Sequence, residues 1–182
     1  YIIRGEGENV ICKLANFIDS SETECNVKNV GYIKDNSLIL NNMECLNDNL
    51  DNLPFPSRDT MDTVLEKKSS VNMVTARGCS GNCEFCSVIS FFRLSNGKVW
   101  RTRSIENIVD EIEELSKKGV KYIKMVDDSF VDGNRDEKWC KDFADEIERR
   151  NLKVKLRGQI RADKVTDQIL CDLKRAGFFS FA

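Results

Sequence analysis

The sequence predicts an α/β fold in which parallel strands alternate with helices, as in part of a (β/α) barrel. Three observations predict it. From residue 71 onward, apolar runs of strand length alternate with stretches of helical spacing. A strand-then-helix order of this kind calls for a parallel sheet. Polar motifs follow directly after three of the strand segments, which is where such barrels carry their chemistry.

The 182-residue chain contains no histidine, and this excludes several kinds of site. No Ser-His-Asp triad, Cys-His dyad, histidine-ligated zinc or histidine-ligated haem can be completed by this chain alone. Its 28 Lys and Arg residues against 30 Asp and Glu residues give a net charge of −2. A nucleic-acid-binding surface is normally basic, and a membrane span needs about 18 consecutive apolar residues. We therefore expect neither nucleic acid nor a membrane as a partner.

Residues 1–70 are expected to precede the barrel in two parts. Tyr1-Ile2-Ile3 is typical of the end of a strand, and helical spacing follows from Val10 to Ile18. Residues 1–19 are therefore predicted to be the end of a preceding α/β domain. Residues 20–70 are predicted to form a linker. It contains a hairpin from Val30 to Leu40 with a turn at Asp35-Asn36, and then a stiff connector at 53–56, which holds both prolines.

Residues 71–182 are predicted to form the N-terminal part of the barrel. Ser104 is a candidate N-cap for the first helix, and Gly119 and Gly177 are positioned to end the first and third helices. The second helix is expected to have a solvated start at 132–137. Since the chain stops after three and a half units, we expect it to be part of a longer protein. The predicted strands cover residues 71–76, 120–126, 154–160 and 178–182, and the predicted helical faces cover 105–115, 139–147 and 169–176.

The eight cysteines separate into a cluster of three and five that stand alone. Cys12, Cys140 and Cys171 fall on helical patterns and are interpreted as small buried apolar residues. For Cys25 and Cys45 the pattern indicates nothing. A long, apolar-patterned chain without a visible signal peptide is unlike a secreted disulfide scaffold. Reduced thiols and a cytoplasmic location are therefore predicted.

Three cysteines crowd into eight residues with the spacing C-x₃-C-x₂-C: Cys79, Cys83 and Cys86. Thiolates are ligands for zinc and for iron–sulfur clusters. A structural zinc site would need a fourth ligand from elsewhere. A [4Fe–4S] cluster on three cysteines leaves one iron open, as a catalytic metal requires. Gly78 and Gly81 give the loop the backbone freedom to wrap a cluster.

The segment from Arg77 to Ser87, RGCSGNCEFCS, closely resembles the signature of radical S-adenosylmethionine (radical SAM) enzymes, in which an aromatic residue precedes the third cysteine. Phe85 occupies that position. The resemblance extends over nearly the whole chain and is to the subgroup associated with a cobalamin-binding domain. Four further stretches carry it: RGEGE at 4–8 and DNLPFPSRD at 51–59, which look like the connection between the two domains, DDSF at 127–130, and RAD at 161–163.

The resemblance implies a barrel of the radical SAM type and a cofactor set. Cys79, Cys83 and Cys86 would hold three irons of a [4Fe–4S] cluster, and S-adenosylmethionine (SAM) would chelate the fourth. An electron supplied by a reductant such as flavodoxin or ferredoxin would cleave SAM to methionine and a 5′-deoxyadenosyl radical. That radical would activate a C–H bond of a small-molecule or peptide substrate, for methyl transfer or rearrangement.

The resemblance also implies roles for four further residues. Phe85 would lie against the adenine, and Asp127 or Asp128 would accept hydrogen bonds from the SAM amino group or ribose. Arg161 would pair with the SAM carboxylate. The cobalamin-binding domain would precede residue 1, and some members offer the cobalt a histidine, which this chain lacks. Cobalamin is therefore assigned to the full-length protein.

The residues alone leave several alternatives open. Asp127-Asp128 also suits a solvated strand end or the cap of the next helix, and Arg161 suits a surface ion pair. The three-cysteine loop also suits a zinc-stabilised binding module. A third alternative is an electron-transfer iron–sulfur protein, which would use a fourth cysteine and no SAM.

Overall fold

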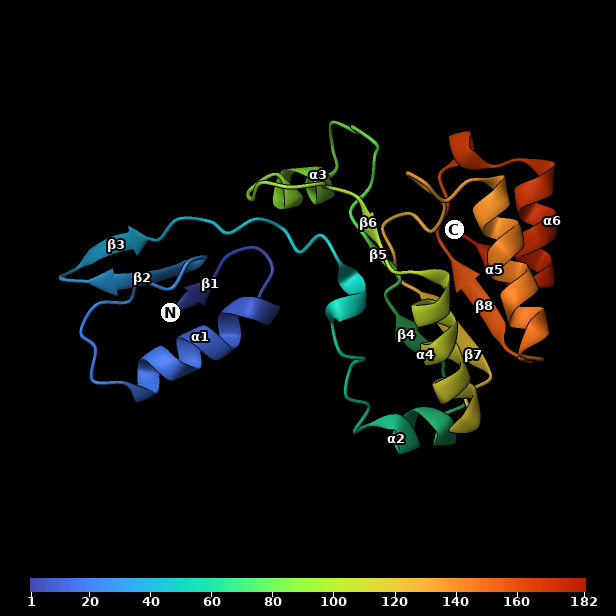
Figure 1. The fold of residues 1–182 in the computed structure, drawn as a ribbon, viewed down its shortest axis with the longest axis horizontal. Helices are drawn as coiled ribbons and strands as arrows, with labels where there is room; N and C mark the ends of the chain where they lie inside the picture. The colour runs from blue at the N-terminus through green and yellow to red at the C-terminus, as the bar shows by residue number, and fades with distance from the viewer. The chain divides into compact units, whose positions relative to one another are not determined.

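The computed structural model describes residues 1–182, and the chain divides into two compact units (Figure 1). Unit 1 comprises Tyr1–Asp48 and Gly81–Val99, and unit 2 comprises Asn49–Ser80 and Trp100–Ala182. Each unit is described by itself. None of the helices combines the length and the apolar character that crossing a membrane requires.

Unit 1 is built on a three-stranded antiparallel sheet and one long helix. The strands β1 (Ile2–Ile3), β2 (Val30–Lys34) and β3 (Ser37–Leu40) lie in the order β1-β2-β3, and α1 (Glu8–Asp19) carries the buried Val10 and Leu14. Asp35 and Asn36 connect β2 to β3 with φ of +48° and +58°, as a two-residue hairpin turn of type I′ requires. The predicted hairpin is therefore confirmed. Unit 1 also contains α3 (Ser87–Phe92).

The linker expected over residues 20–70 is not a separate connector. Its hairpin belongs to unit 1 because β1 pairs with β2, with Ile3 opposite Val30. The segment from Asn49 onward belongs to unit 2, where it forms a short 3₁₀ turn, η1 (Leu50–Asn52), and α2 (Met61–Glu66). Met61 is buried in the core of unit 2. Strand pairing at one end and burial of apolar side chains at the other thus divide the expected linker.

Unit 2 contains a four-stranded parallel sheet in the order β4-β7-β8-β9, which confirms the predicted fold class. A second, antiparallel pair was not predicted. It joins β5 (Ala76–Arg77) to β6 (Arg101–Thr102), so the expected strand over 71–76 is divided. Two-residue strands are too short to show a period in sequence. The strands of the parallel sheet are β4 (Val71–Met73), β7 (Tyr122–Met125), β8 (Lys155–Gly158) and β9 (Phe178–Phe181).

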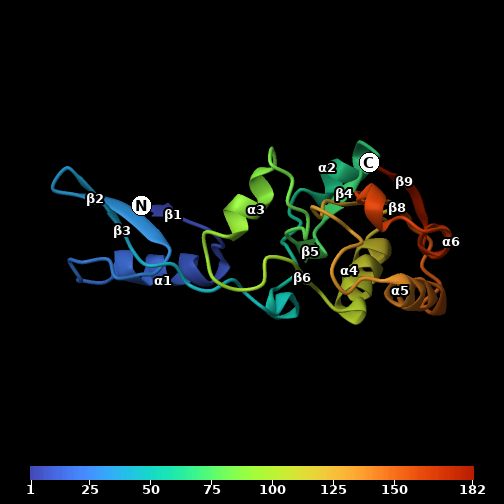
Figure 2. The same cartoon turned by 90° about the horizontal axis from the view of Figure 1, so that it is seen from above.

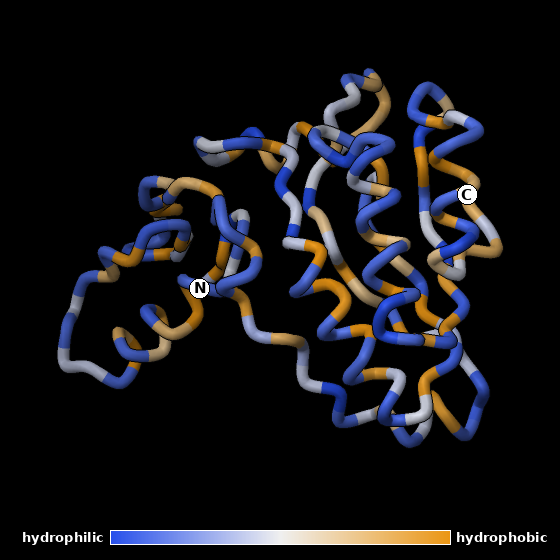
Figure 3. The backbone as a smooth tube through the Cα atoms, turned by 45° about the vertical axis from the view of Figure 1, so that its right-hand side comes forward, coloured by the Kyte–Doolittle hydropathy of each residue, from blue (hydrophilic) through white to orange (hydrophobic).

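Three amphipathic helices, α4 (Ile105–Lys117), α5 (Glu137–Arg149) and α6 (Asp167–Arg175), cover one face of this sheet (Figures 1 and 2). Hydrophobic and hydrophilic residues alternate along the helical parts of the chain (Figure 3). Each helix begins at a side-chain cap that satisfies a free backbone N–H. The Ser104 hydroxyl accepts from the Asn107 N–H at 3.1 Å, as predicted, and the other two caps are Asp136 and Thr166.

Glu111 attaches the proline-containing segment of unit 2 to α4. Its buried carboxylate accepts from Arg58 Nη2 at 2.6 Å and from Arg103 Nη1 at 2.5 Å. Arg58 Nη1 also donates to the Asn72 carbonyl at 2.8 Å, and the Arg103 guanidinium lies 5.1 Å from the centre of the Phe55 ring. Removing one partner of such a buried pair leaves an uncompensated charge, so these contacts fix the path of residues 50–58.

Substitution of the two glycines that follow helices α4 and α6 tests how closely the backbone at Gly177 packs against Val154. Gly119 and Gly177 have φ of +91° and +101°; a Cβ would meet nothing within 4 Å at Gly119, but at Gly177 it would lie 2.4 Å from the Val154 carbonyl oxygen. We expect Gly119→Ala to lower the free energy of unfolding by about 1 kcal/mol, through backbone strain alone. Gly177→Ala should cost about 3 kcal/mol, because backbone must also move. Equal costs in urea unfolding would contradict this packing.

Candidate metal centre

The three-cysteine loop begins in unit 2 and continues in unit 1. Cys79 lies two residues after β5, and Cys83 and Cys86 precede α3. The Cys86 N–H donates to the Cys83 carbonyl at 3.0 Å, which turns the chain into α3. All eight cysteines are free thiols; Cys83 is exposed, and Cys79 and Cys86 are half-buried. The structure brings together no set of three cysteine, aspartate or glutamate side chains able to hold a metal ion.

Asp127 lies two residues after β7 and is fully buried against the segment that leads into the loop. One carboxylate oxygen accepts from the Thr75 N–H at 2.6 Å, and the other accepts from the Thr75 hydroxyl. The second oxygen also lies 3.3 Å from Arg135 Nη1. All of the Asp127 side chain is thus used by protein partners. In this arrangement Asp127 supports the backbone before β5, and its contact with SAM stays a prediction.

Arg135 is the second member of this buried pair, and each of its guanidinium nitrogens has a partner. Nε and Nη2 donate to the Thr102 hydroxyl at 2.9 and 2.6 Å, Nη2 donates to the Thr75 carbonyl at 2.8 Å, and Nη1 donates to the Phe130 carbonyl at 2.8 Å. The guanidinium also lies 4.4 Å from the centre of the Trp139 ring. Burial lowers the pKa of Arg135 to about 10, against the opposing effect of Asp127, so Arg135 stays charged at neutral pH.

Two more carboxylates beyond β7 hold the backbone on either side of Cys79. Asp128 accepts from the Gly78 N–H at 3.0 Å, and Asp132 accepts from the Ser80 N–H at 2.8 Å and from the Ser80 hydroxyl. Gly78 has φ of +82°, a conformation that favours glycine. We call Asp127, Asp128 and Asp132 the β7 carboxylates. They fasten residues 75–80, and with them the first predicted cluster ligand, to the carboxyl end of the sheet.

The pKa shifts of Asp128 and Asp132 differ in direction for a physical reason. Burial raises the pKa of Asp128, and the negative charge of Asp127 adds to the rise, against one hydrogen bond from Gly78. Burial alone would also raise the pKa of Asp132. Hydrogen bonds from Ser80, from the Gly133 N–H and from the Cys79 thiol outweigh that effect, and the net pKa is lowered. Asp132 is therefore the more firmly ionised support.

Arg161 reaches the first cysteine from the loop after β8. Its Nη1 donates to the Cys79 sulfur at 3.8 Å, and its Nε and Nη2 bind both oxygens of Asp163 at 2.9 and 2.8 Å. The predicted alternative of an ion pair is thus present, with Asp163 as the partner. The contact with Cys79 was not predicted.

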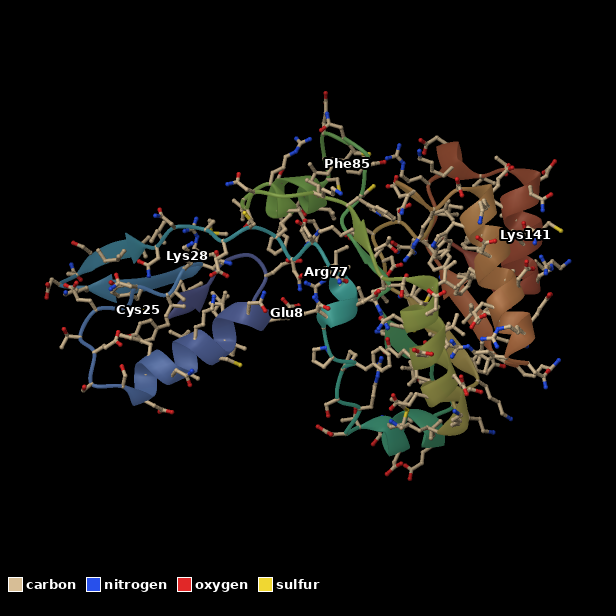
Figure 4. The ribbon with its side chains drawn as sticks, in the orientation of Figure 1. Glu8, Cys25, Lys28, Arg77, Phe85 and Lys141 are labelled. Carbon is tan, nitrogen blue, oxygen red and sulfur yellow. The ribbon has the colours of Figure 1, made fainter.

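Phe85, labelled in Figure 4 on the loop before α3, is 93% exposed. An aromatic ring left in solvent is open to stacking by a flat ligand.

The donor set of the loop suits an iron–sulfur cluster. Three free thiols within eight residues offer soft ligands, and Cys79 already accepts a charge-assisted hydrogen bond. The five other cysteines are spread over both units. Cys140 is buried, as predicted, but the same prediction was wrong for Cys12 and Cys171, which are exposed on the outer sides of their helices.

Sequence reasoning missed three residues that organise the site: Thr75, Asp132 and Arg135. Asp132 was expected at a solvated helix start, yet it is 1% exposed, and Arg135 is 2% exposed. Asp132 binds Ser80, 52 residues away, and Arg135 binds Thr102 and Thr75, which are 33 and 60 residues away in sequence. The one available signal was the density of acidic residues directly after a strand.

The chain is similar in sequence to a known protein family and to several known proteins. A family model of the radical SAM superfamily matches residues 73–182. An uncharacterized methyltransferase of Pyrococcus horikoshii is 28% identical over 181 residues, which cover 97% of this chain and 38% of that protein. A putative methylthiotransferase of Methanocaldococcus jannaschii is 30% identical over 122 residues, 67% of this chain and 24% of that protein. The chain thus spans well under half the length of these relatives.

Solved structures of similar fold include those of two enzymes. The cobalamin-dependent SAM radical enzyme OxsB, with aqua-cobalamin and SAM bound, superposes with a TM-score of 0.76 at 20% identity, over 97% of this chain and 27% of that one. The radical SAM methyltransferase TsrM from Kitasatospora setae, with cobalamin and a [4Fe–4S] cluster bound, gives 0.73 at 16% identity, over 98% and 37%. The family model, which matches more than half of the chain, shows that it belongs to the radical SAM superfamily, as its cysteine loop predicted.

Proposed function

We propose that the protein is a radical SAM enzyme that holds a [4Fe–4S] cluster on Cys79, Cys83 and Cys86. The observation that carries the proposal is the attachment of residues 78–80 to the carboxyl end of a parallel sheet, where barrels of this kind carry their chemistry. When bound, the cluster would supply the electron, received from a flavodoxin or ferredoxin, for cleavage of SAM to methionine and a 5′-deoxyadenosyl radical, which would take a hydrogen atom from the substrate.

The chain's own residues contribute binding and positioning in this proposal. Asp128 is the member of the predicted pair that binds SAM, because one of its oxygens accepts from Gly78 and the other has no partner. Phe85 offers its exposed ring to the adenine. Arg161 already pairs with Asp163, so the SAM carboxylate would have to replace the Asp163 carboxylate as its partner. Its Nη1 lies 3.8 Å from the Cys79 sulfur.

The reaction assigned to the whole protein is methyl transfer or rearrangement. Support comes from the relatives, one of which carries the name of a methyltransferase and another that of a methylthiotransferase. OxsB and TsrM were solved with cobalamin bound, so a cobalamin cofactor is proposed for the full-length protein. The small-molecule or peptide substrate, the reductant and the cytoplasmic location stay predictions.

Anaerobic reconstitution with iron and sulfide tests the cluster directly. We expect about four iron and four sulfide per chain, and 5′-deoxyadenosine and methionine in equal amounts after reduction with SAM present. The variant with Cys79→Ala, Cys83→Ala and Cys86→Ala should lose both metal and product. The matched control replaces three exposed lone cysteines, Cys12→Ala, Cys45→Ala and Cys171→Ala, and should keep both.

Two outcomes would contradict the proposal. One is zinc without sulfide in the wild-type protein, which indicates a metal-stabilised binding module. The other is a cluster whose electron paramagnetic resonance spectrum does not change with SAM, which indicates an electron-transfer protein.

Asp132→Asn tests the support of the first ligand without any metal. The variant loses a charged acceptor shared by the Ser80 N–H and hydroxyl, so we expect the free energy of unfolding at pH 7 to fall by about 2 kcal/mol. Because the folded pKa of Asp132 is lowered, this contribution is complete above about pH 4 and shrinks as the pH falls further. Asp142→Asn, at an exposed pair with Lys138, should leave the free energy of unfolding nearly unchanged. If both variants lowered the free energy of unfolding equally, Asp132 would not be a support of the first ligand.

A further inference from the structure

The face of the parallel sheet opposite the helices carries a row of polar side chains, one from each strand. The strand register places Asn72 beside Lys124, Lys124 beside Arg157, and Arg157 beside Ser180. The neighbouring row, on the other face, is apolar and buried against the helices. Two of the four side chains in the polar row are cations, and none is acidic.

A hollow of about 230 Å³ is lined in part by the two cations of this row, Lys124 and Arg157. No acidic residue lines it, although the chain has more acidic than basic residues overall. The cations at the hollow have no ion pair, whereas Arg150 and Arg175 near the helices pair with carboxylates at 2.6 to 2.9 Å. The hollow is lined by Lys68, Ser70, Tyr122, Ile123, Lys124, Arg157 and Phe179.

A β-bulge in β9 adds an apolar wall to this cationic hollow. The register advances by one on β8 and by two on β9, from Leu156 opposite Phe178 to Arg157 opposite Ser180. Phe179 is the extra residue, and its side chain is 61% exposed at the hollow. A bulge redirects a side chain that regular pairing would place elsewhere, and bulges recur beside binding sites. An exposed phenylalanine next to unpaired cations suits a ligand with an anionic end and an apolar or aromatic body.

We propose that this hollow binds the anionic end, a carboxylate or a phosphate, of an organic substrate with an apolar or aromatic body. The inference rests on the proposed function, which places the reacting carbon at the carboxyl end of the strands. Lys124 lies four residues before Asp128 on the same chain, which is roughly 13 Å in extended backbone. The substrate therefore carries its anion and its reacting carbon about that far apart. Arg157 can bind a carboxylate or phosphate through two parallel hydrogen bonds, and Lys124 adds a point charge.

Calorimetric titration with phenyl phosphate, benzoate and inorganic phosphate tests the site. Phenyl phosphate or benzoate should bind more tightly than inorganic phosphate, and the tighter of the two identifies the anion. Arg157→Gln and Lys124→Gln should each weaken that binding about tenfold, since each removes a charge-assisted hydrogen bond. Phe179→Ala should weaken binding of the aromatic probe and leave inorganic phosphate unchanged. Lys153→Gln removes an exposed cation outside the hollow and should change nothing.

Failure of this inference and failure of the proposed function give different results. No binding of any probe, or equal weakening by Arg157→Gln and Lys153→Gln, overturns the anion site even when the cluster assembles and cleaves SAM. Loss of anion binding in Arg157→Gln from a protein that assembles no cluster supports the site and overturns the proposed function alone. Iron and sulfide are therefore measured on the same preparations.

Discussion

The buried pair of Asp127 and Arg135 is the interaction on which the arrangement of the site depends. A buried ion pair contributes little to stability by itself, because desolvation offsets the attraction. Here every donor of the guanidinium and both carboxylate oxygens have partners, so the pair specifies one backbone path. Thr75 accepts from Arg135 and donates to Asp127, which fixes the chain as it leaves β4. The strand pair β5–β6 and the start of the cysteine loop follow from that position.

The other β7 carboxylates extend the same principle toward the first ligand. Asp128 and Asp132 satisfy the N–H groups of Gly78 and Ser80, and Arg161 approaches the sulfur of the residue between them. Residues on the loops after two neighbouring parallel strands thus converge on three consecutive residues. Acidic side chains that family resemblance assigns to a cofactor serve first to hold the protein's own backbone. Only Asp128 combines that role with a free oxygen.

Local patterns predicted the elements well because the causes of those elements are local. The cap at Ser104 and the hairpin turn at Asp35-Asn36 depend on neighbouring residues, and both are present as predicted. The family could be predicted because three cysteines in a short loop form a contiguous motif. The buried role of Arg135 could not be predicted, since its partners Thr75 and Thr102 are distant in sequence. The pairing of β1 with β2 also joins segments that are distant in sequence, so the sequence of the hairpin alone could not predict it. This pairing places the hairpin in unit 1 and not in a separate linker.

Amide hydrogen exchange on the metal-free protein tests most directly whether the β7 carboxylates hold the loop before any cluster binds. The Gly78 and Ser80 amides donate to carboxylates, whereas those of Glu84 and Phe85 have no such acceptor. We expect exchange at Gly78 and Ser80 to be slowed at least tenfold relative to Glu84 and Phe85, after correction for intrinsic rates, because each must break a hydrogen bond to a charged group. Equal exchange at all four amides would contradict the account.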